Sequence, residues 1–125
     1  HEALRIRKVF GGGMRQAGYL AAAGSYALKH HRKDLSLDHK RAKEIAEVLE
    51  NCSFVHEIQP VTTNIIIFSL KSDYDEVQFV QELKEKQILI IGLGKGKLRM
   101  VTHRDYTREH HTYLLTTLSK MEVYA

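Results

Sequence analysis

Three consecutive glycines followed by an arginine form the first group of residues that could do chemistry. Residues 11–13 stand between a basic, helix-compatible segment and a long alanine-rich run, and Arg15 follows directly after Met14. A glycine turn that opens a helix leaves backbone N–H groups bare, which suits an anion such as phosphate. The forked guanidinium of Arg15 would add further donors. The same residues also fit a flexible elbow between two helices with Arg15 in solvent.

Arg99 is the second candidate, because it lies in an expected short strand directly after the glycine-rich turn at residues 92–96. A strand arginine is costly to bury without an anionic partner, so Arg99 is a candidate ligand for an anion. The alternative is a salt bridge at the rim with a side chain such as Asp105. Thr102 and His103 follow as a candidate acid–base pair, since histidine titrates near neutrality. The alternative for His103 is a hydrogen bond to the backbone at the strand end.

Other motifs fail on their spacing. The segment at residues 92–96 lacks the third glycine of a dinucleotide fingerprint and the spacing of a P-loop. His30 and His31 point about 100° apart on a helix, and we interpret them as part of a cationic helix end. The single cysteine, Cys52, excludes an intramolecular disulfide and a multi-cysteine metal site. We therefore expect no metal site in this chain.

The composition is that of an ordinary folded domain. The chain has 125 residues, of which 43% are hydrophobic and 27% charged, enough to bury a core. Its apolar runs are too short to span a membrane, and the single cysteine fits a reducing cytoplasm. The net charge of +4 suits nucleic acid or an anionic cofactor equally well.

Periodicity places the elements that must position these residues. Helices are expected over residues 2–9, 15–30 and 37–50, from the capping sequence at 72–75 to about 86, and after Thr107. We expect the fourth helix to bury Val77, Val80 and Leu83, and the last to bury Leu114, Leu115 and Leu118.

Strands are expected over residues 54–59, 64–70, 88–91 and 97–102. The β-branched composition of residues 64–70 predicts a central strand buried on both faces, and residues 88–91 predict another buried strand. The order is therefore helices followed by ββαββα, which is typical of an α+β layer with a mostly antiparallel sheet and helices on one face.

Three segments carry a resemblance to a known family. The run RKVFGGGMRQAGYLAAAGSYAL resembles the segment after the cofactor lysine in low-specificity threonine aldolases, which belong to the threonine aldolase and beta-eliminating lyase family. Residues 60–66 resemble the family's P-V-x-T-N-I strand, and residues 97–105 its R-x-V-T-H-x-D segment. The resemblance implies the small C-terminal domain of an aspartate-aminotransferase-like pyridoxal-phosphate enzyme. Residues 1–31 would then be the glycine turn and inter-domain helix leading from an absent large domain, and residues 32–125 the small domain.

The resemblance also implies roles for single residues. Arg99 would grip the substrate α-carboxylate, Arg15 would help to hold the cofactor phosphate in a neighbouring subunit's site, and Lys8 would lie at the same subunit boundary. Lys8 equally fits a solvated basic face. Arg104 stands where the family usually has an apolar residue, which leaves the local packing open. Because the Schiff-base lysine and the ring-stacking histidine belong to the large domain, we expect this chain to be inert alone.

The implied activity is cleavage of L-threonine or L-allo-threonine to glycine and acetaldehyde. The partners would be this β-hydroxy-α-amino acid, the rest of the same polypeptide, and further copies in a dimer or tetramer, without nucleic acid or membrane. The alternative is a small basic ββαββα module that binds nucleic acid. Its strands would be unusually aliphatic, with only Phe54 and Phe68 as strand aromatics, which argues against base stacking.

Overall fold

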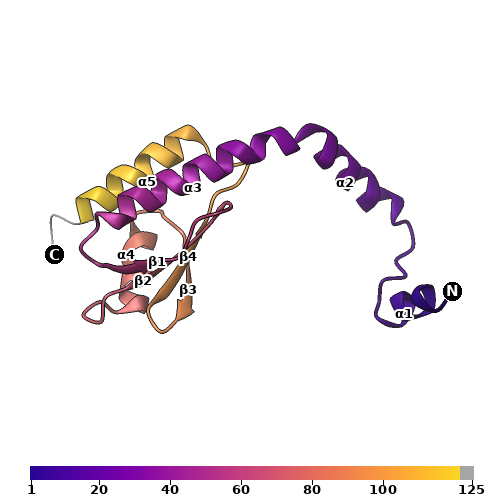
Figure 1. Cartoon of the computed structure of the whole chain (residues 1–125), viewed down its shortest axis with the longest axis horizontal. Helices are drawn as coiled ribbons and strands as arrows, with labels where there is room; N and C mark the ends of the chain where they lie inside the picture. The colour runs from indigo at the N-terminus through magenta and orange to yellow at the C-terminus, as the bar shows by residue number, and fades with distance from the viewer. Residues whose placement is uncertain (122–125) are drawn as a thin grey trace. The chain divides into compact units, whose positions relative to one another are not determined.

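The computed structural model describes residues 1–121, which divide after Lys33 into two compact units. The first unit holds helices α1 (Glu2–Val9) and α2 (Gly18–His30), drawn in indigo and purple in Figure 1. The predicted helix over residues 2–9 is confirmed. Helix α2 begins three residues later than residue 15, the expected start, because Arg15 and its neighbours form a turn.

The glycines end helix α1 instead of opening helix α2. Gly11 N–H donates to the Lys8 carbonyl at 3.1 Å and Gly12 N–H to the Arg7 carbonyl at 2.8 Å, while Gly11 has a φ of +80°. This is the cap that a left-handed glycine gives to a helix C-terminus. The prediction of a helix-opening turn with bare N–H groups was therefore wrong, since two of those groups already have partners.

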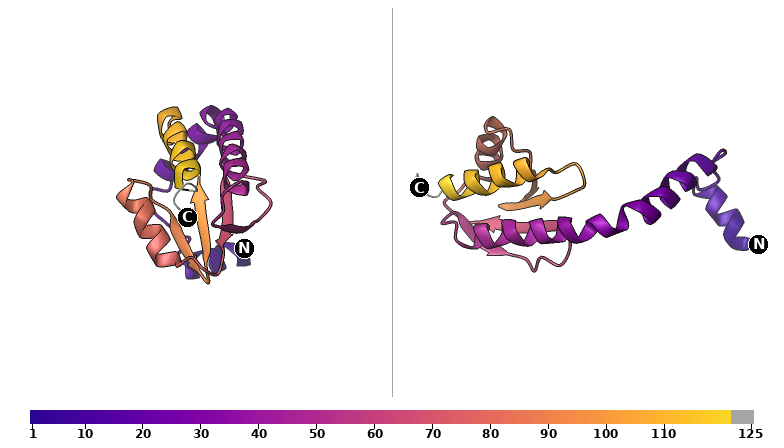
Figure 2. Two further views of the ribbon diagram at one scale, coloured as in Figure 1. Left: turned by 90° about the vertical axis from the view of Figure 1, so that its left-hand side faces the viewer. Right: turned by 90° about the horizontal axis from the view of Figure 1, so that it is seen from above.

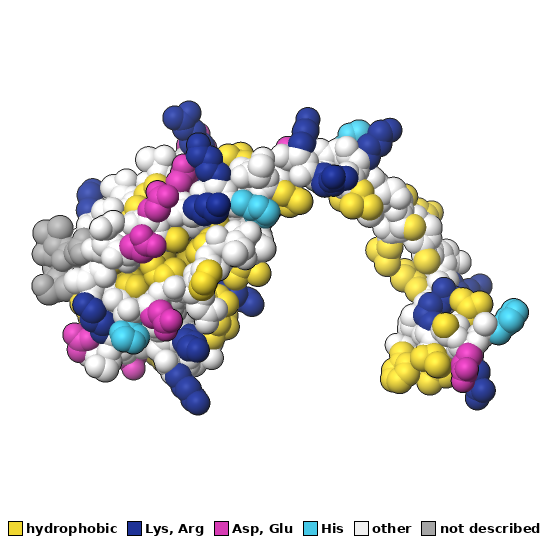
Figure 3. Space-filling model, viewed as in Figure 1, with side chains coloured by type: hydrophobic (Ala, Val, Ile, Leu, Met, Phe, Trp, Pro, Cys, Tyr) yellow, Lys and Arg dark blue, Asp and Glu magenta, His cyan; other side chains and the backbone are white. Residues whose placement is uncertain are grey.

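The first unit buries none of its helical residues. Its exposed apolar side chains, part of the yellow surface in Figure 3, are Leu4, Ile6, Val9, Phe10, Met14, Tyr19, Leu20, Tyr26 and Leu28. Such a concentration of exposed apolar side chains is typical of a surface that packs against other protein.

The second unit is an α+β layer. A short 3-10 helix (Arg32–Asp34) crosses the boundary between the units in the chain. The elements that follow it are α3 (Leu35–Glu50), β1 (Val55–Ile58), β2 (Ile65–Leu70), α4 (Glu76–Glu85), β3 (Ile91–Gly94), β4 (Lys97–Val101) and α5 (Arg108–Met121). The four strands form one antiparallel sheet in the order β1-β2-β4-β3. The predicted ββαββα order and α+β class are confirmed, although the third strand begins at Ile91 and not at residue 88.

Helices α3, α4 and α5 share one hydrophobic core with one face of the sheet. Figure 2 shows α3 and α5 side by side over the strands. The helices contribute Ala42, Ile45, Leu49, Phe79, Leu83, Leu114 and Leu118, and the strands contribute Ile66, Phe68, Leu70, Leu98 and Met100. The predicted burial of Val77 was wrong, because its side chain is 76% exposed and Phe79 takes the inward position on α4.

The other face of the sheet is uncovered by the described residues of the second unit. We call it the open face and define it by Ile65, Ile67, Ile91, Arg99 and Val101, which the strand register places on the side opposite the core. Ile65 is 42% exposed, and every residue of β3 is exposed. The prediction of a strand buried on both faces over residues 64–70 was therefore wrong for this chain, since its helices cover one face only. The prediction of a buried strand over residues 88–91 was also wrong, because these residues are partly or fully exposed.

Candidate functional site

Arg99 occupies the middle of the open face. It is the central residue of β4, where Leu98 and Met100 on either side point into the core. Ile67 of β2 and Ile91 of β3 are its direct cross-strand partners. Cross-strand partners share a face of the sheet, so the arginine side chain rises between two isoleucines.

The guanidinium of Arg99 has no anionic partner among residues 1–121. Its Nε is buried and makes no hydrogen bond, and the ion pairs found in the described chain involve other residues. The predicted alternative, a salt bridge with Asp105, is not formed. A buried donor without an acceptor costs about 1–3 kcal/mol, so the arrangement favours an acceptor brought from outside. The planar fork of arginine matches a carboxylate bidentately.

Hydrogen bonds between Asn64 and Thr102 link the two strand motifs at residues 60–66 and 97–105. The Asn64 side-chain amide donates to the Thr102 carbonyl at 2.6 Å, and the Thr102 N–H donates to the Asn64 carbonyl at 3.0 Å. The Thr102 hydroxyl donates to the Asp38 carbonyl at 2.8 Å. These bonds close the β2–β4 pair beyond Val101 and fasten it to α3, which fixes the strand that carries Arg99.

Neither member of the Thr102–His103 pair is arranged for proton transfer. The Thr102 side chain is 1% exposed and its hydroxyl is occupied by Asp38. His103 Nδ1 accepts the Asp105 backbone N–H at 3.2 Å. His103 therefore bonds to the backbone, as the alternative prediction stated, and Thr102 stabilises the fold by its hydrogen bond to Asp38.

Replacing Thr102 with valine is expected to lower the free energy of unfolding by about 1–3 kcal/mol, because the Asp38 carbonyl loses its donor while the side-chain volume stays similar. Urea unfolding of the two chains measures the difference. Thr112→Val on the exposed face of α5 is the control, and an equally small change in both variants would show that the Thr102 hydroxyl does not stabilise the fold.

Arg104 forms an ion pair where the resembled family has an apolar residue. Its Nη1 lies 2.7 Å from Asp34 Oδ2 at the start of the second unit. Both side chains are substantially exposed, and pairs of this kind contribute about 0–1 kcal/mol. Arg104 thus pairs with Asp34 at the surface and fills no apolar position.

A polar network between α3 and α5 was not predicted from the sequence. His111 Nε2 lies 2.8 Å from Glu44 Oε2, and His111 Nδ1 lies 3.2 Å from the Tyr106 hydroxyl. Arg41 donates to the Tyr106 carbonyl. Burial raises the pKa of Tyr106 to about 12, against the opposing effect of Arg41. The sequence did contain a signal for this network, because His111 stands three residues before Leu114 on the apolar stripe of α5, where a polar side chain needs a buried partner.

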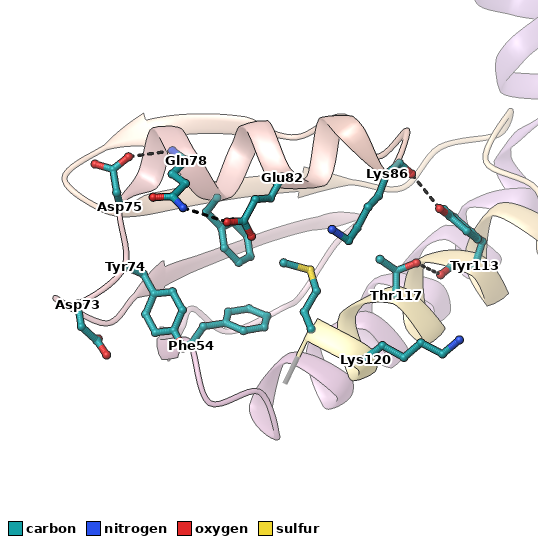
Figure 4. Close-up of a pocket in the computed structure, with 12 residues that line it drawn as sticks. Phe54, Asp73, Tyr74, Asp75, Gln78, Glu82, Lys86, Tyr113, Thr117 and Lys120 are labelled. Carbon is teal, nitrogen blue, oxygen red and sulfur yellow. Dashed lines mark hydrogen bonds between the residues drawn. The ribbon is translucent and has the colours of Figure 1, made fainter. Parts of the chain in front are cut away.

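A cleft with a volume of about 700 Å³ lies between α4 and α5 (Figure 4). Two of its three carboxylates have structural partners, since Asp75 accepts the Gln78 N–H at 2.8 Å and Glu82 accepts the Gln78 side-chain amide at 3.2 Å, and the third, Asp73, is exposed. Tyr113 donates to the Lys86 carbonyl at 3.0 Å. We assign no chemistry to this cleft.

The other predicted site residues, Lys8 and Arg15, lie in the first unit and are exposed. Neither side chain forms a hydrogen bond or ion pair within the described residues, and the two do not interact with each other. The backbone of Lys8 takes part in the helix cap through its carbonyl. Both side chains are thus free to meet a ligand or another part of a larger protein.

Two further features are absent from the described residues, a cluster of metal ligands and a membrane-spanning helix. Residues 1–121 contain no group of three or more potential metal ligands. None of the helices in this range has the length and apolar character needed to cross a bilayer.

The comparison with known families settles the family to which these motifs belong. The model of the beta-eliminating lyases matches residues 1–73, more than half of the chain. The chain belongs to the beta-eliminating lyase family. A low-specificity L-threonine aldolase of Arabidopsis thaliana is 34% identical over 118 residues, which cover 92% of this chain and 33% of that protein. The low-specificity L-threonine aldolase of Escherichia coli K12 is 37% identical, over 86% of this chain and 31% of that protein.

Similar solved structures confirm the fold. A histidinol-phosphate aminotransferase from Clostridium acetobutylicum matches 69% of this chain and 26% of its own, at 20% identity and a TM-score of 0.56. An ornithine aminotransferase from Plasmodium yoelii matches 72% of this chain and 24% of its own, at 13% identity and a TM-score of 0.57. The predicted aminotransferase-like fold class is confirmed, and the lyase family agrees with pyridoxal phosphate as its cofactor class. The chain spans about a third of the length of the curated relatives it matches.

Proposed function

We propose that this chain supplies the carboxylate-binding arginine of a threonine-cleaving, pyridoxal-phosphate-dependent lyase. The observation that carries the proposal is Arg99, a strand arginine between two isoleucines whose buried Nε has no partner within residues 1–121. The threonine aldolases among the relatives give the substrate class, a β-hydroxy-α-amino acid. The products would be glycine and an aldehyde.

The residues of the chain fit an amino-acid substrate bound beside this cofactor. The unpartnered Arg99 suits the α-carboxylate, and exposed Arg15 suits a phosphate oxygen. Backbone N–H groups at Gly11 and Gly12 are excluded as phosphate donors, because they already cap α1. When bound, pyridoxal phosphate supplies an electron sink for cleavage of the Cα–Cβ bond.

Arg99 would act by orientation. Two parallel N–H···O bonds to the carboxylate fix the rotation of the amino acid about its Cα, and so determine which bond is presented for cleavage. Ile67 and Ile91 on either side would displace part of the water around the pair, which would strengthen the attraction between the opposite charges. We assign no proton transfer to this chain, because Thr102 and His103 are engaged with the backbone.

The first unit would dock onto the rest of a larger protein or a second subunit. Its exposed apolar side chains need such a partner, and an Arg15 that serves a neighbouring active site requires at least a dimer. The nucleic-acid alternative gains no support, because Phe54 and Phe68 are each 1% exposed and cannot stack on bases.

Arg15→Ala in the complete protein is expected to weaken pyridoxal-phosphate binding about 10- to 100-fold, since a charged hydrogen bond to phosphate contributes about 1.5–3 kcal/mol. Titration of the apoenzyme with cofactor measures the affinity. Arg5→Ala, which removes an exposed arginine of α1, is the matched control. Unchanged affinity in Arg15→Ala would remove this residue from the phosphate site.

The proposed activity is tested by following glycine release from threonine with saturating pyridoxal phosphate. The complete protein is expected to release glycine, and the 125-residue chain alone to release none. A complete protein that binds the cofactor and leaves threonine and allo-threonine intact would refute the substrate assignment. A complete protein that takes up no cofactor would refute the lyase proposal.

A further inference from the structure

The carboxylate of Glu76 holds the turn between β3 and β4. Glu76 Oε1 accepts the Gly94 N–H at 3.0 Å, and Oε2 accepts the Gly96 N–H at 2.8 Å. Glu76 is the first residue of α4, and the Asp75 side chain caps that helix by accepting the Gln78 N–H. A single side chain therefore ties the start of a helix to both sides of the hairpin turn.

Strand β3 has no buried face to fix its pairing register, which therefore depends on the turn that joins it to β4. It is an edge strand with the sequence Ile-Gly-Leu-Gly, and all four residues are exposed. Its pairing with β4 is irregular between Gly92 and Gly94. The turn that follows has three successive residues with positive φ, at 84°, 57° and 74°. Glycine-rich strands without a buried face specify register weakly, and the turn of a hairpin then fixes it, so a contact that holds this turn also holds the register.

Gly92 leaves the space that the Glu76 carboxylate occupies. A Cβ added at Gly92 would lie 2.3 Å from Glu76 Oε1, a distance that no side chain could tolerate without moving the carboxylate. Gly92 has no positive φ that would otherwise require glycine. The contact of the Glu76 carboxylate with the turn therefore requires a residue without a side chain at position 92.

The register held by Glu76 determines what lies beside Arg99. Ile91 is now opposite Arg99 and Gly92 is opposite Leu98. A slip of one residue would place Gly92 beside the guanidinium and turn Ile91 to the other face, because side chains alternate along a strand. The apolar wall on one side of Arg99 would then be lost.

We propose that Glu76 is a positioning residue for the carboxylate site. By fixing the register of β3 it keeps Ile91 beside the Arg99 guanidinium, and so maintains the affinity of Arg99 for a carboxylate. The inference rests on the proposed function of Arg99, and two separate measurements test it.

The first measurement is amide hydrogen exchange by NMR in the 125-residue chain. Glu76→Gln keeps one acceptor oxygen and sets an NH₂ group against the other backbone donor, so exchange at Gly94 and Gly96 is expected to accelerate about tenfold. Glu85→Gln is the matched control, because Glu85 is an exposed residue of the same helix whose carboxylate accepts a hydrogen bond from the Gln81 side chain. Unchanged exchange in Glu76→Gln would overturn the claim that this carboxylate holds the turn.

The second measurement is steady-state kinetics of the complete protein. Glu76→Gln is expected to raise KM for the amino acid about tenfold with kcat within about twofold, since the reacting groups are untouched. Gly92→Ala displaces the same carboxylate from the other side and should give the same change, and the double variant should be no worse than either single one. A purely structural contact would alter stability without a selective rise in KM.

The outcomes separate this inference from the proposed function. Faster exchange with an unchanged KM, while Arg99→Ala still impairs the enzyme, would overturn the positioning role of Glu76 alone. Kinetics that Arg99→Ala also leaves unchanged would refute the carboxylate role of Arg99, and the positioning role would fall with it.

Discussion

Arg99→Ala in the complete protein is expected to lower kcat/KM for threonine by about 10²–10³-fold, equivalent to about 2.7–4 kcal/mol. The variant removes both donors of the guanidinium fork and leaves the carboxylate facing two isoleucines, Ile67 and Ile91. Part of the loss should appear as a higher KM and part as slower cleavage, because orientation as well as affinity is lost. Steady-state release of glycine measures both constants.

Two further variants make this result specific. Arg99→Lys keeps the charge and loses the planar fork, so it should recover only part of the activity. Lys97→Ala removes a cation from the same strand, two residues away, and should leave kcat/KM within about threefold. The absorbance of the bound cofactor should be unchanged in all three variants. Loss of cofactor in Arg99→Ala, or an equal loss of activity in Lys97→Ala, would contradict the carboxylate role.

Phe68→Ala is expected to lower the free energy of unfolding of the 125-residue chain by about 3–5 kcal/mol. The Phe68 ring is 1% exposed and belongs to the core shared by the helices and the sheet. Removing it leaves a cavity that the surrounding side chains of β2 and β4 can fill only in part. Urea unfolding followed by circular dichroism measures the loss.

Ile65→Ala on the same strand is the control for this prediction. Ile65 lies on the open face and is 42% exposed, so its truncation should cost less than about 1 kcal/mol. A strand covered on both faces would give large losses at both positions. That result would contradict the single-sided core of the second unit.

The periodic elements were the most predictable part of the fold. The stripe of Ala42, Ile45 and Leu49 on α3 and the inward Leu114 and Leu118 on α5 follow directly from helical spacing. The burial of the strands was not predictable from their composition. An apolar strand is suited to burial on both faces, but its sequence does not show whether helices of the same chain pack against both of them. The prediction for the glycine turn was wrong because a glycine run is compatible with the end of one helix as well as with the start of another.

The sequence was sufficient to select Arg99 as the candidate site residue, but not to predict which residues surround it. Arg99 could be selected because a strand arginine needs a partner, and the family motif indicated which one. Its setting between Ile67 and Ile91 depends on strand register, which pairs residues distant in sequence. The bonds from Glu76 to Gly94 and Gly96 span 18 and 20 residues, a separation at which no local pattern gives a signal.

The most direct test of the central claim is a crystal structure of the complete protein with pyridoxal phosphate and glycine, the proposed product. We predict that the Arg99 guanidinium donates two parallel hydrogen bonds to the glycine carboxylate, at about 2.7–2.9 Å, with Ile67 and Ile91 on either side. An Arg99 paired to a protein carboxylate, with the glycine carboxylate held by another residue, would contradict the claim.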